Sequence, residues 1–407
     1  MNASAAPWQL KRLLSAPHRL GFAIGAAAIG LFALWWLAVL LAARLGFAPG
    51  WAVPPTLAHG LLFTLGFMPA FMTGFLFTAG PRWLGQPGVD ARTLLTALLQ
   101  LAVGWLIAFV GIHASAWLAA FGVATSACGW LRLSLRFAAM LRVSRVLDRL
   151  HARWVLAACF VGVVAMLLAC LALVQGDAVL LRAAIQFGLW GFVGPVYAVV
   201  SHRMIPFFSA AALPQLEAWR PNALLLPMLG GLALSGVAEM GWLAPSLLAP
   251  PLALASLALL ALALRWGLAQ SLKGESRRLL AMLHGGFVWL GLALGLQAAS
   301  QARLAFGLAG LGTAPLHALT LGWLGCTLMA MVTRVAAGHS GRSLAVDNLG
   351  WAAYRLLQLA VLLRVAAALG LAVGLLPAAA IWAAVVATWG WRQGAWLGRP
   401  RVDGQPG

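Results

Sequence analysis

The stretch LGFAIGAAAIGLFALWWLAVLLAA, residues 20–43, decides the fold class. It contains no charged or amide side chain, and it is longer than the roughly 20 residues that an α-helix needs to cross a bilayer. It is also longer than the apolar region of a cleavable signal peptide, which has about 7–15 residues. We therefore expect an anchor helix that stays in the membrane.

The rest of the chain repeats this pattern. Of its 407 residues, 63% are hydrophobic and 9% are charged, whereas soluble domains carry about 25% charged residues. Such a chain cannot cover itself with a polar surface in water, but in a bilayer it does not need to. We predict an all-α polytopic transmembrane helix bundle with twelve spans: 20–44, 55–79, 93–112, 114–131, 154–174, 179–201, 222–242, 246–269, 279–300, 304–333, 349–373 and 377–397.

We expect one transmembrane domain, residues 20–397, between two short cytoplasmic ends. Residues 1–19 would form an N-terminal segment. Residues 398–407, with Pro400, Gly404, Pro406 and Gly407, would form a disordered tail. No internal repeat is visible in the sequence, which argues against a transporter built from inverted repeats.

The basic residues test this topology independently of hydropathy. With the N-terminus inside, 22 of the 27 Lys and Arg residues fall on the inner side, while Arg44, Arg182 and Arg303 fall outside and Arg355 and Arg364 lie within the eleventh span. Because basic side chains are retained on the cytoplasmic side, both termini are predicted to be inside. The net charge of +19 has the same origin. The basic residues do not gather on one polar face, so we exclude nucleic acid as a partner.

Cysteines and carboxylates narrow the chemistry. The four cysteines lie inside apolar runs without a CxxC pair, so a disulfide framework is unsupported. Of the eight acidic residues only Glu239 lies within a span, which argues against a carboxylate-driven pump. The sequence has no HExxH motif and no phosphate-binding glycine loop, so it assigns no catalytic reaction.

The eight histidines are the most informative polar residues. Three lie in loops or at span ends, where we expect them to be solvated: His18, His113 and His151. Five lie in spans or beside their ends: His202, His284 and His339 toward the inner side, and His59 and His317 toward the middle or outer half. A lone intramembrane histidine can simply bond a neighbouring helix. Imidazole is also a common ligand of haem iron and copper, and a haem in a helix bundle needs one or two such ligands.

Side chains beside these histidines extend the pattern. Arg334, at the end of the tenth span, and Arg203, next to His202, can bind a haem propionate, because a guanidinium matches a carboxylate. They can equally extend to the inner headgroups. Met204, Met329 and Met331 carry thioethers, which suit Cu(I) but also pack well in apolar helices.

Several blocks of the sequence resemble the NnrS family of membrane proteins. The blocks are Ala58-His59-Gly60 with Gly66-Phe67, Gly74-Phe75-Leu76 and Pro81-Arg82-Trp83; the run Ser201-His-Arg-Met-Ile-Pro-Phe-Phe208; His284 before Trp289; and His317-Ala-Leu-Thr-Leu-Gly with Met331-Val-Thr-Arg334 and Gly338-His339-Ser-Gly341-Arg342. The start, Ala16-Pro17-His18-Arg19, is also similar. The block from His317 to Arg342 is the most specific.

The resemblance implies a multi-span protein of the bacterial inner membrane, linked to nitric oxide, nitrosative stress and denitrification and associated with haem and copper. It implies metal or cofactor roles for His59, His202, His284, His317, Arg334 and His339. One block departs from the family, whose second span commonly shows His-x-His-Glu. Here these positions are Leu57, Ala58, His59 and Gly60. The missing His and Glu argue against a metal site that needs both residues. They argue against copper more strongly than against haem.

We therefore expect a haem-binding, and by the resemblance copper-associated, protein in the lipid bilayer. It would meet nitric oxide or a related small molecule at the metal, or pass one electron to a redox partner protein. The expected ligands are His317 with either His202 or His284. Two alternatives stay open: a transporter of a small molecule or metal, and an assembly factor for a respiratory complex.

Overall fold

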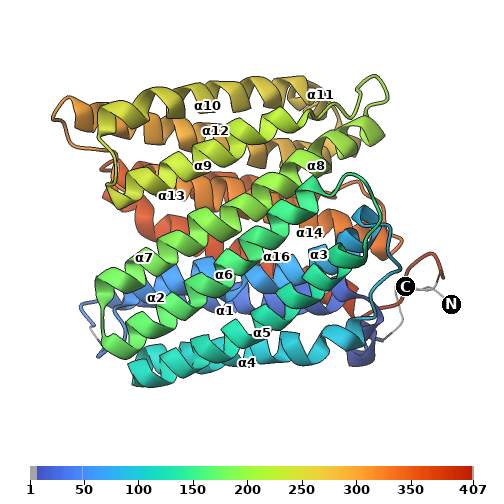
Figure 1. The fold of residues 1–407 in the computed structure, drawn as a ribbon, viewed down its shortest axis with the longest axis horizontal. Coiled ribbons are helices and arrows are strands. Elements are labelled where there is room, and N and C mark those ends of the chain that lie inside the picture. The colour runs from blue at the N-terminus through green and yellow to red at the C-terminus, as the bar shows by residue number, and fades with distance from the viewer. Residues whose placement is uncertain (1–6, 48, 406–407) are drawn as a thin grey trace. The chain divides into compact units, whose positions relative to one another are not determined.

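The structure, a computed structural model, describes residues 7–47 and 49–405, and within them every regular element is helical (Figure 1). Twelve helices are long and apolar enough to cross a membrane. They are Pro17–Arg44, Pro55–Trp83, Ala91–Ala114, Ala116–Val143, Leu150–Gln175, Ala178–Ala212, Asn222–Met240, Pro245–Arg265, Glu275–Ala305, Ala314–His339, Asn348–Ala368 and Ala372–Leu397. The predicted polytopic helix bundle with twelve spans is confirmed.

The helices form two compact units. The first contains the chain up to Val196, Val335–Arg342 and the chain from Val386 onward, and the second contains Tyr197–Arg334 and Ser343–Val385. Most helices pack against helices close to them in sequence, and the single domain, residues 20–397, stays a prediction. Three helices contribute residues to both units: α8 (Gly194–Ala212), α14 (Cys326–His339) and α16 (Leu375–Leu397).

The other elements belong to one unit each. The first unit contains η2 (Leu10–Ser15), α1 (Pro17–Arg44), α2 (Pro55–Leu61), η3 (Leu62–Gly66), α3 (Met68–Trp83), η4 (Ala91–Leu94), α4 (Leu95–Ala114), α5 (Ala116–Val143), α6 (Leu150–Gln175), α7 (Ala178–Gly188) and η5 (Leu189–Val193). The second contains η6 (Asn222–Leu224), α9 (Leu225–Met240), α10 (Pro245–Arg265), α11 (Leu268–Ser271), η7 (Glu275–Arg277), α12 (Arg278–Ala305), α13 (Ala314–His317), η8 (Ala318–Gly325), α15 (Asn348–Ala368) and η9 (Ala372–Gly374).

Local sequence explains where the helices begin and end. Proline occupies the first turn of several helices, as Pro17 does in α1, where its missing N–H costs nothing. The carboxylate of Asp177 accepts hydrogen bonds from the first amides of α7, and Asp347 caps α15 in the same way. Gly176 ends α6 with a φ of 66°, which a residue with a side chain rarely adopts.

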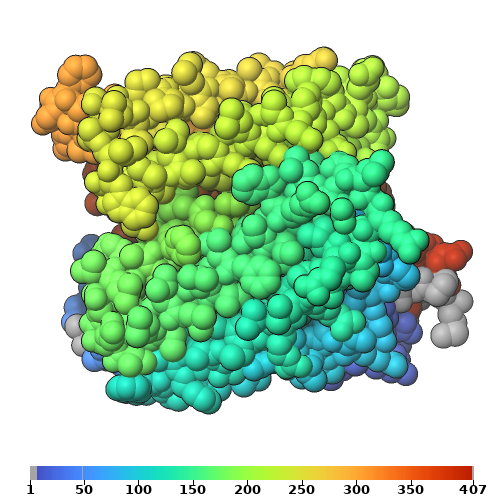
Figure 2. Space-filling view, viewed as in Figure 1, coloured from blue at the N-terminus to red at the C-terminus, as the bar shows by residue number. Residues whose placement is uncertain are grey.

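Glycine also lets helices approach closely. Ser115 alone separates α4 from α5, which form the third and fourth spans. A Cβ on Gly111 would lie 2.1 Å from the amide nitrogen of Ala119, and one on Gly122 would lie 2.2 Å from that of Ala108. The two backbones are therefore in contact, as in small-residue packing of membrane helices. Figure 2 shows that the side chains of α5, α6 and α7, which are neighbours, close one face of the first unit.

Three helix ends differ from the prediction by ten residues or more. The fourth and sixth spans continue to Val143 and Ala212, because helix formation does not stop where the apolar run stops. The tenth span begins at Ala314 and not at residue 304, since Gly307 and Gly312 adopt positive φ and break the helix before it. This last change moves His317 from mid-span to the first turn.

Three spans contain a π-helical stretch, at intervals of four spans. The stretches are η3 in the second span, η5 in the sixth and η8 in the tenth. The first and last carry related sequences, Thr64-Leu-Gly-Phe67 and Thr320-Leu-Gly-Trp323. π-Helical segments are rare and often mark functional sites. The structure thus shows a periodicity that the sequence did not make visible.

Candidate functional site

His317 presents the geometry of a metal-binding histidine. Its Nδ1 lies 2.9 Å from the backbone carbonyl oxygen of Thr313. A carbonyl oxygen can only accept, so the neutral ring carries its proton on Nδ1 and its lone pair on Nε2. A hydrogen bond of this kind fixes the tautomer and ring orientation of histidines that bind metal through the other nitrogen. His317 is half-buried in the first turn of the tenth span.

Arg364 and His317 both contact Thr313. One guanidinium nitrogen of Arg364 donates to the hydroxyl of Thr313 at 3.2 Å. Arg364 is half-buried within the eleventh span, where a cation is expensive unless it has a partner. Our sequence analysis located Arg364 in a span but assigned it no role. The cost of a guanidinium among apolar residues was the signal that could have singled it out.

His284 is fully buried on α12 in the second unit. Its Nε2 lies 3.1 Å from the hydroxyl of Ser209, and its Nδ1 is buried without a hydrogen-bond partner. The hydroxyl oxygens of Ser201 and Thr327 are likewise buried and unpartnered. Unsatisfied polar groups are rare in protein interiors, so these atoms indicate a place where a ligand, ion or water is bound.

His284 and His317 do not share one iron. Gly286, two residues after His284, lies against Thr327, because a Cβ on it would be 2.6 Å from that hydroxyl. Thr327 is ten residues beyond His317 in the same span, roughly 15 Å along the helix axis. Two axial ligands of one haem must lie much closer. The expected pair of His317 with His284 is therefore not assembled.

His202 is no closer to His317. Its Nε2 lies 3.1 Å from the carbonyl oxygen of Pro221, and its ring lies 6.2 Å from that of Trp266. Helix α8 runs parallel to the tenth span, since Tyr197 contacts Trp323 and Phe208 contacts Arg334. His202 is consequently level with residue 328, again roughly 15 Å from His317 along the axis.

Arg334 and His317 lie at opposite ends of the tenth span. They are 17 residues apart, roughly 25 Å at the rise of an α-helix. The guanidinium carbon of Arg334 is 3.8 Å from the centre of the Phe208 ring, a cation–π contact. One haem cannot reach both residues, so Arg334 is not the propionate partner of a haem at His317.

His59 is held between aromatic rings in the first unit. Its ring stacks on Trp36, with centroids 4.1 Å apart, and lies 4.4 Å from Phe63. Leu57, at the position where the family commonly carries the first His, is a buried apolar residue, and Gly60, at the position of the Glu, has no side chain. This turn therefore supplies one imidazole, as the departure from the family motif predicted.

His339 is paired with a histidine that we expected to be solvated. It ends the tenth span, and its ring centroid lies 4.4 Å from that of His18. His18 is only 3% exposed because α1 begins at Pro17 and packs it against α3, with its Cα close to Gly74. His151 is also buried on α6, so it too is not solvated, whereas His113 is exposed and accepts a hydrogen bond from Trp35.

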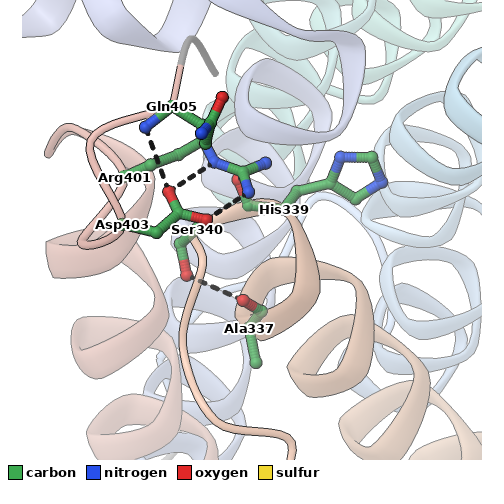
Figure 3. Close-up of polar contacts among 6 residues, drawn as sticks. All are labelled: Ala337, His339, Ser340, Arg401, Asp403 and Gln405. Atoms are coloured by element: carbon green, nitrogen blue, oxygen red, sulfur yellow. Dashed lines mark hydrogen bonds and ion pairs between the residues drawn. The ribbon is translucent and has the colours of Figure 1, made fainter.

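The C-terminal tail, predicted from the sequence to be disordered, has contacts with the turn after His339 (Figure 3). The amide of Val402 donates to the carbonyl of Ser340 at 3.0 Å, and Arg401 donates to the carbonyl of His339 at 3.4 Å. Arg401 also holds Asp403 with two hydrogen bonds and lowers the pKa of that carboxyl to about 2. These contacts involve residues 401–405, while 406 and 407 lie outside the described part.

Among residues 7–47 and 49–405, no three His, Cys, Asp or Glu side chains come together in an arrangement that could hold a metal ion. Copper in proteins is often held by several histidines, and such a set is absent from this part of the chain. A haem needs only one axial protein ligand, with its propionates bound elsewhere. The donor sets present here fit haem better than a multi-histidine copper site.

These features define a polytopic helical membrane protein that carries histidines in its spans. The model of one family, described as NnrS protein, matches residues 12–401, nearly the whole chain. The chain therefore belongs to the NnrS family. No curated protein and no solved structure matches it.

Proposed function

We propose that this protein binds haem in the bacterial inner membrane, with His317 as the axial ligand of the iron, and that it acts in the response to nitric oxide and nitrosative stress. The nitric-oxide context rests on its membership of the NnrS family and on the resemblance described above. The orientation of His317 by the carbonyl of Thr313 is the observation that supports the haem ligand best.

The distances within the second unit favour an iron with one protein ligand. His202 and His284 both lie roughly 15 Å from His317 along the helix axes, so neither supplies the opposite axial ligand. Haem would supply an iron whose free axial position can take a small diatomic molecule. We therefore favour a haem that binds nitric oxide at its iron over a haem with two histidine ligands that transfers electrons.

The residues around His317 have distinct tasks in this proposal. Thr313 fixes the tautomer of His317 with its carbonyl and contacts Arg364 with its hydroxyl. Arg364 supplies a guanidinium for a haem propionate, a pairing that is charge-assisted and strong in apolar surroundings. Copper remains a second cofactor implied by the family resemblance, and His59, His202 and His284 are the predicted metal ligands that the haem proposal leaves over.

The test is the absorption spectrum of the full chain purified in detergent from haem-supplemented cells. We expect a Soret band that shifts when nitric oxide is added, is lost in His317→Ala and returns in part when imidazole is supplied to that variant. His113→Ala, which removes an exposed histidine at the end of another span, is the matched control and should keep the band. A colourless wild type, or a Soret band unchanged in His317→Ala, contradicts the proposal.

A further inference from the structure

The pair formed by His18 and His339 has an unusual polar environment. The rings face each other with an interplanar angle of 37°, and the Nδ1 of His18 is buried without a hydrogen-bond partner. The ring of His339 points away from Arg401 and Asp403 (Figure 3). A donor or acceptor left open in such a buried place indicates a missing ligand.

The surroundings of this pair are positively charged. Arg82, Arg401 and Arg19 all act electrostatically on His339, and Arg19 acts on His18 as well. Arg19 is held in place because it donates to the carbonyls of Leu397 and Arg399 at 2.7 and 2.8 Å. The carboxylate of Asp403 is bound by Arg401, so it does not compensate the other two guanidinium groups.

This charge decides between a metal ion and an anion. Two neutral imidazoles could in principle hold a metal cation, as we expected for His339. The unpaired guanidinium groups of Arg19 and Arg82 would repel that cation, and the pair brings no carboxylate or thiolate to offset the repulsion. An anion gains from the same charges and can accept hydrogen bonds from both the imidazoles and the guanidinium groups.

We propose that His18 and His339, together with Arg19 and Arg82, form a binding site for a phosphate group. The chemistry fits the headgroup of an anionic phospholipid or free inorganic phosphate. His18 is the second residue of the first span, Arg82 the last but one of the second, and His339 the last of the tenth. All three lie at span ends predicted to face the cytoplasm, where the headgroups of the inner leaflet lie.

The segment before His18 resembles a membrane-interface element. Trp8 and Leu10 are exposed, and Lys11 and Arg12 follow in the short helix η2. Exposed aromatic and aliphatic residues beside basic ones are typical of chains that lie in the headgroup region. This makes a lipid phosphate the more accessible of the two sources. The proposal does not depend on haem binding.

The experiment measures retention of phosphatidylglycerol by the full chain with native mass spectrometry, beside phosphatidylcholine and, in lipid-free detergent, inorganic phosphate alone. We expect one phosphatidylglycerol to be retained and its affinity to fall about tenfold in both His18→Gln and Arg82→Gln, the loss of a charge-assisted hydrogen bond. Binding of inorganic phosphate with the same sensitivity would identify free phosphate as the source. Arg82 is exposed, so its variant should fold even if the buried His18 does not tolerate change.

Arg153→Gln is the matched control, because it removes another exposed cation on the predicted inner side. It should leave retention unchanged. Equal losses in Arg82→Gln and Arg153→Gln would mean that charge acts diffusely, and the proposal would be overturned. The same holds if neither probe responds to the variants at His18 and Arg82, or if the pair binds Cu(I) or Zn(II) in a manner abolished by His18→Gln.

Discussion

His317 and His339 lie near opposite ends of one membrane span, residues 314–339, and their surroundings suit ligands of opposite charge. His317 has its Nδ1 bonded to a carbonyl, which leaves the lone pair on Nε2, the arrangement of a histidine that binds a metal. His339 faces a second imidazole amid guanidinium groups, which disfavours a metal and favours an anion. The residue type is the same, and the neighbours decide its chemistry.

The largest expected effect is a complete separation of the two sites. His317→Ala should abolish haem binding and leave phosphatidylglycerol retention unchanged. His339→Gln should weaken lipid retention about tenfold, as expected for a lost hydrogen bond to a charged group, and leave the haem content unchanged. Haem content from the pyridine haemochrome spectrum and lipid retention are measured on the same preparations. Loss of haem in His339→Gln would contradict the separation of the two sites.

Sequence predicted the spans well because apolar length and charge asymmetry are properties of the chain itself. The twelve spans needed no tertiary information. Even so, the start of the tenth span was wrong by ten residues, because Gly307 and Gly312 end helicity within an apolar run. Hydropathy gives no information about residues whose backbone φ is positive.

The surroundings of each histidine could not be predicted in the same way. His18 appeared to be a loop residue, but α1 begins one residue earlier and packs it into the unit. Its contact with His339 joins residues 321 positions apart, which no single sequence specifies. Arg364 was visible as an intramembrane cation, yet its link to His317 depends on how α15 packs against the turn at Thr313.

A smaller effect is expected from Arg364, and it would sharpen the distinction between the sites. Arg364→Gln should weaken haem binding about tenfold, since it removes a charge-assisted hydrogen bond to a propionate. Haem transfer to an acceptor protein measures this affinity. Arg355→Gln, an exposed cation on the same helix, is the control and should have no effect. Equal haem affinity in the wild type and Arg364→Gln would place the propionates elsewhere.

The smallest effect concerns the tail beside His339. Arg401 and the amide of Gln405 lower the pKa of Asp403 to about 2, below the value near 3.9 of an unfolded chain. A lowered carboxyl pKa means that the contact is fully present above about pH 4 and weakens only as the pH falls toward 2. Hydrogen exchange of the Val402 amide, corrected for its intrinsic rate, should therefore be constant between pH 7 and 5.

Asp403→Asn should raise the exchange of that amide about twofold at neutral pH, because exposed ion pairs contribute little. Asp177→Asn removes a carboxylate that caps α7 and should leave the exchange of the Val402 amide unchanged.

Protection of the Val402 amide that disappears near pH 4 would show that Arg401 does not hold Asp403. In that case Arg401 would be available to the phosphate site, and lipid retention by Asp403→Asn should equal that of the wild type. If the pair is intact, releasing Arg401 should instead strengthen lipid retention in this variant.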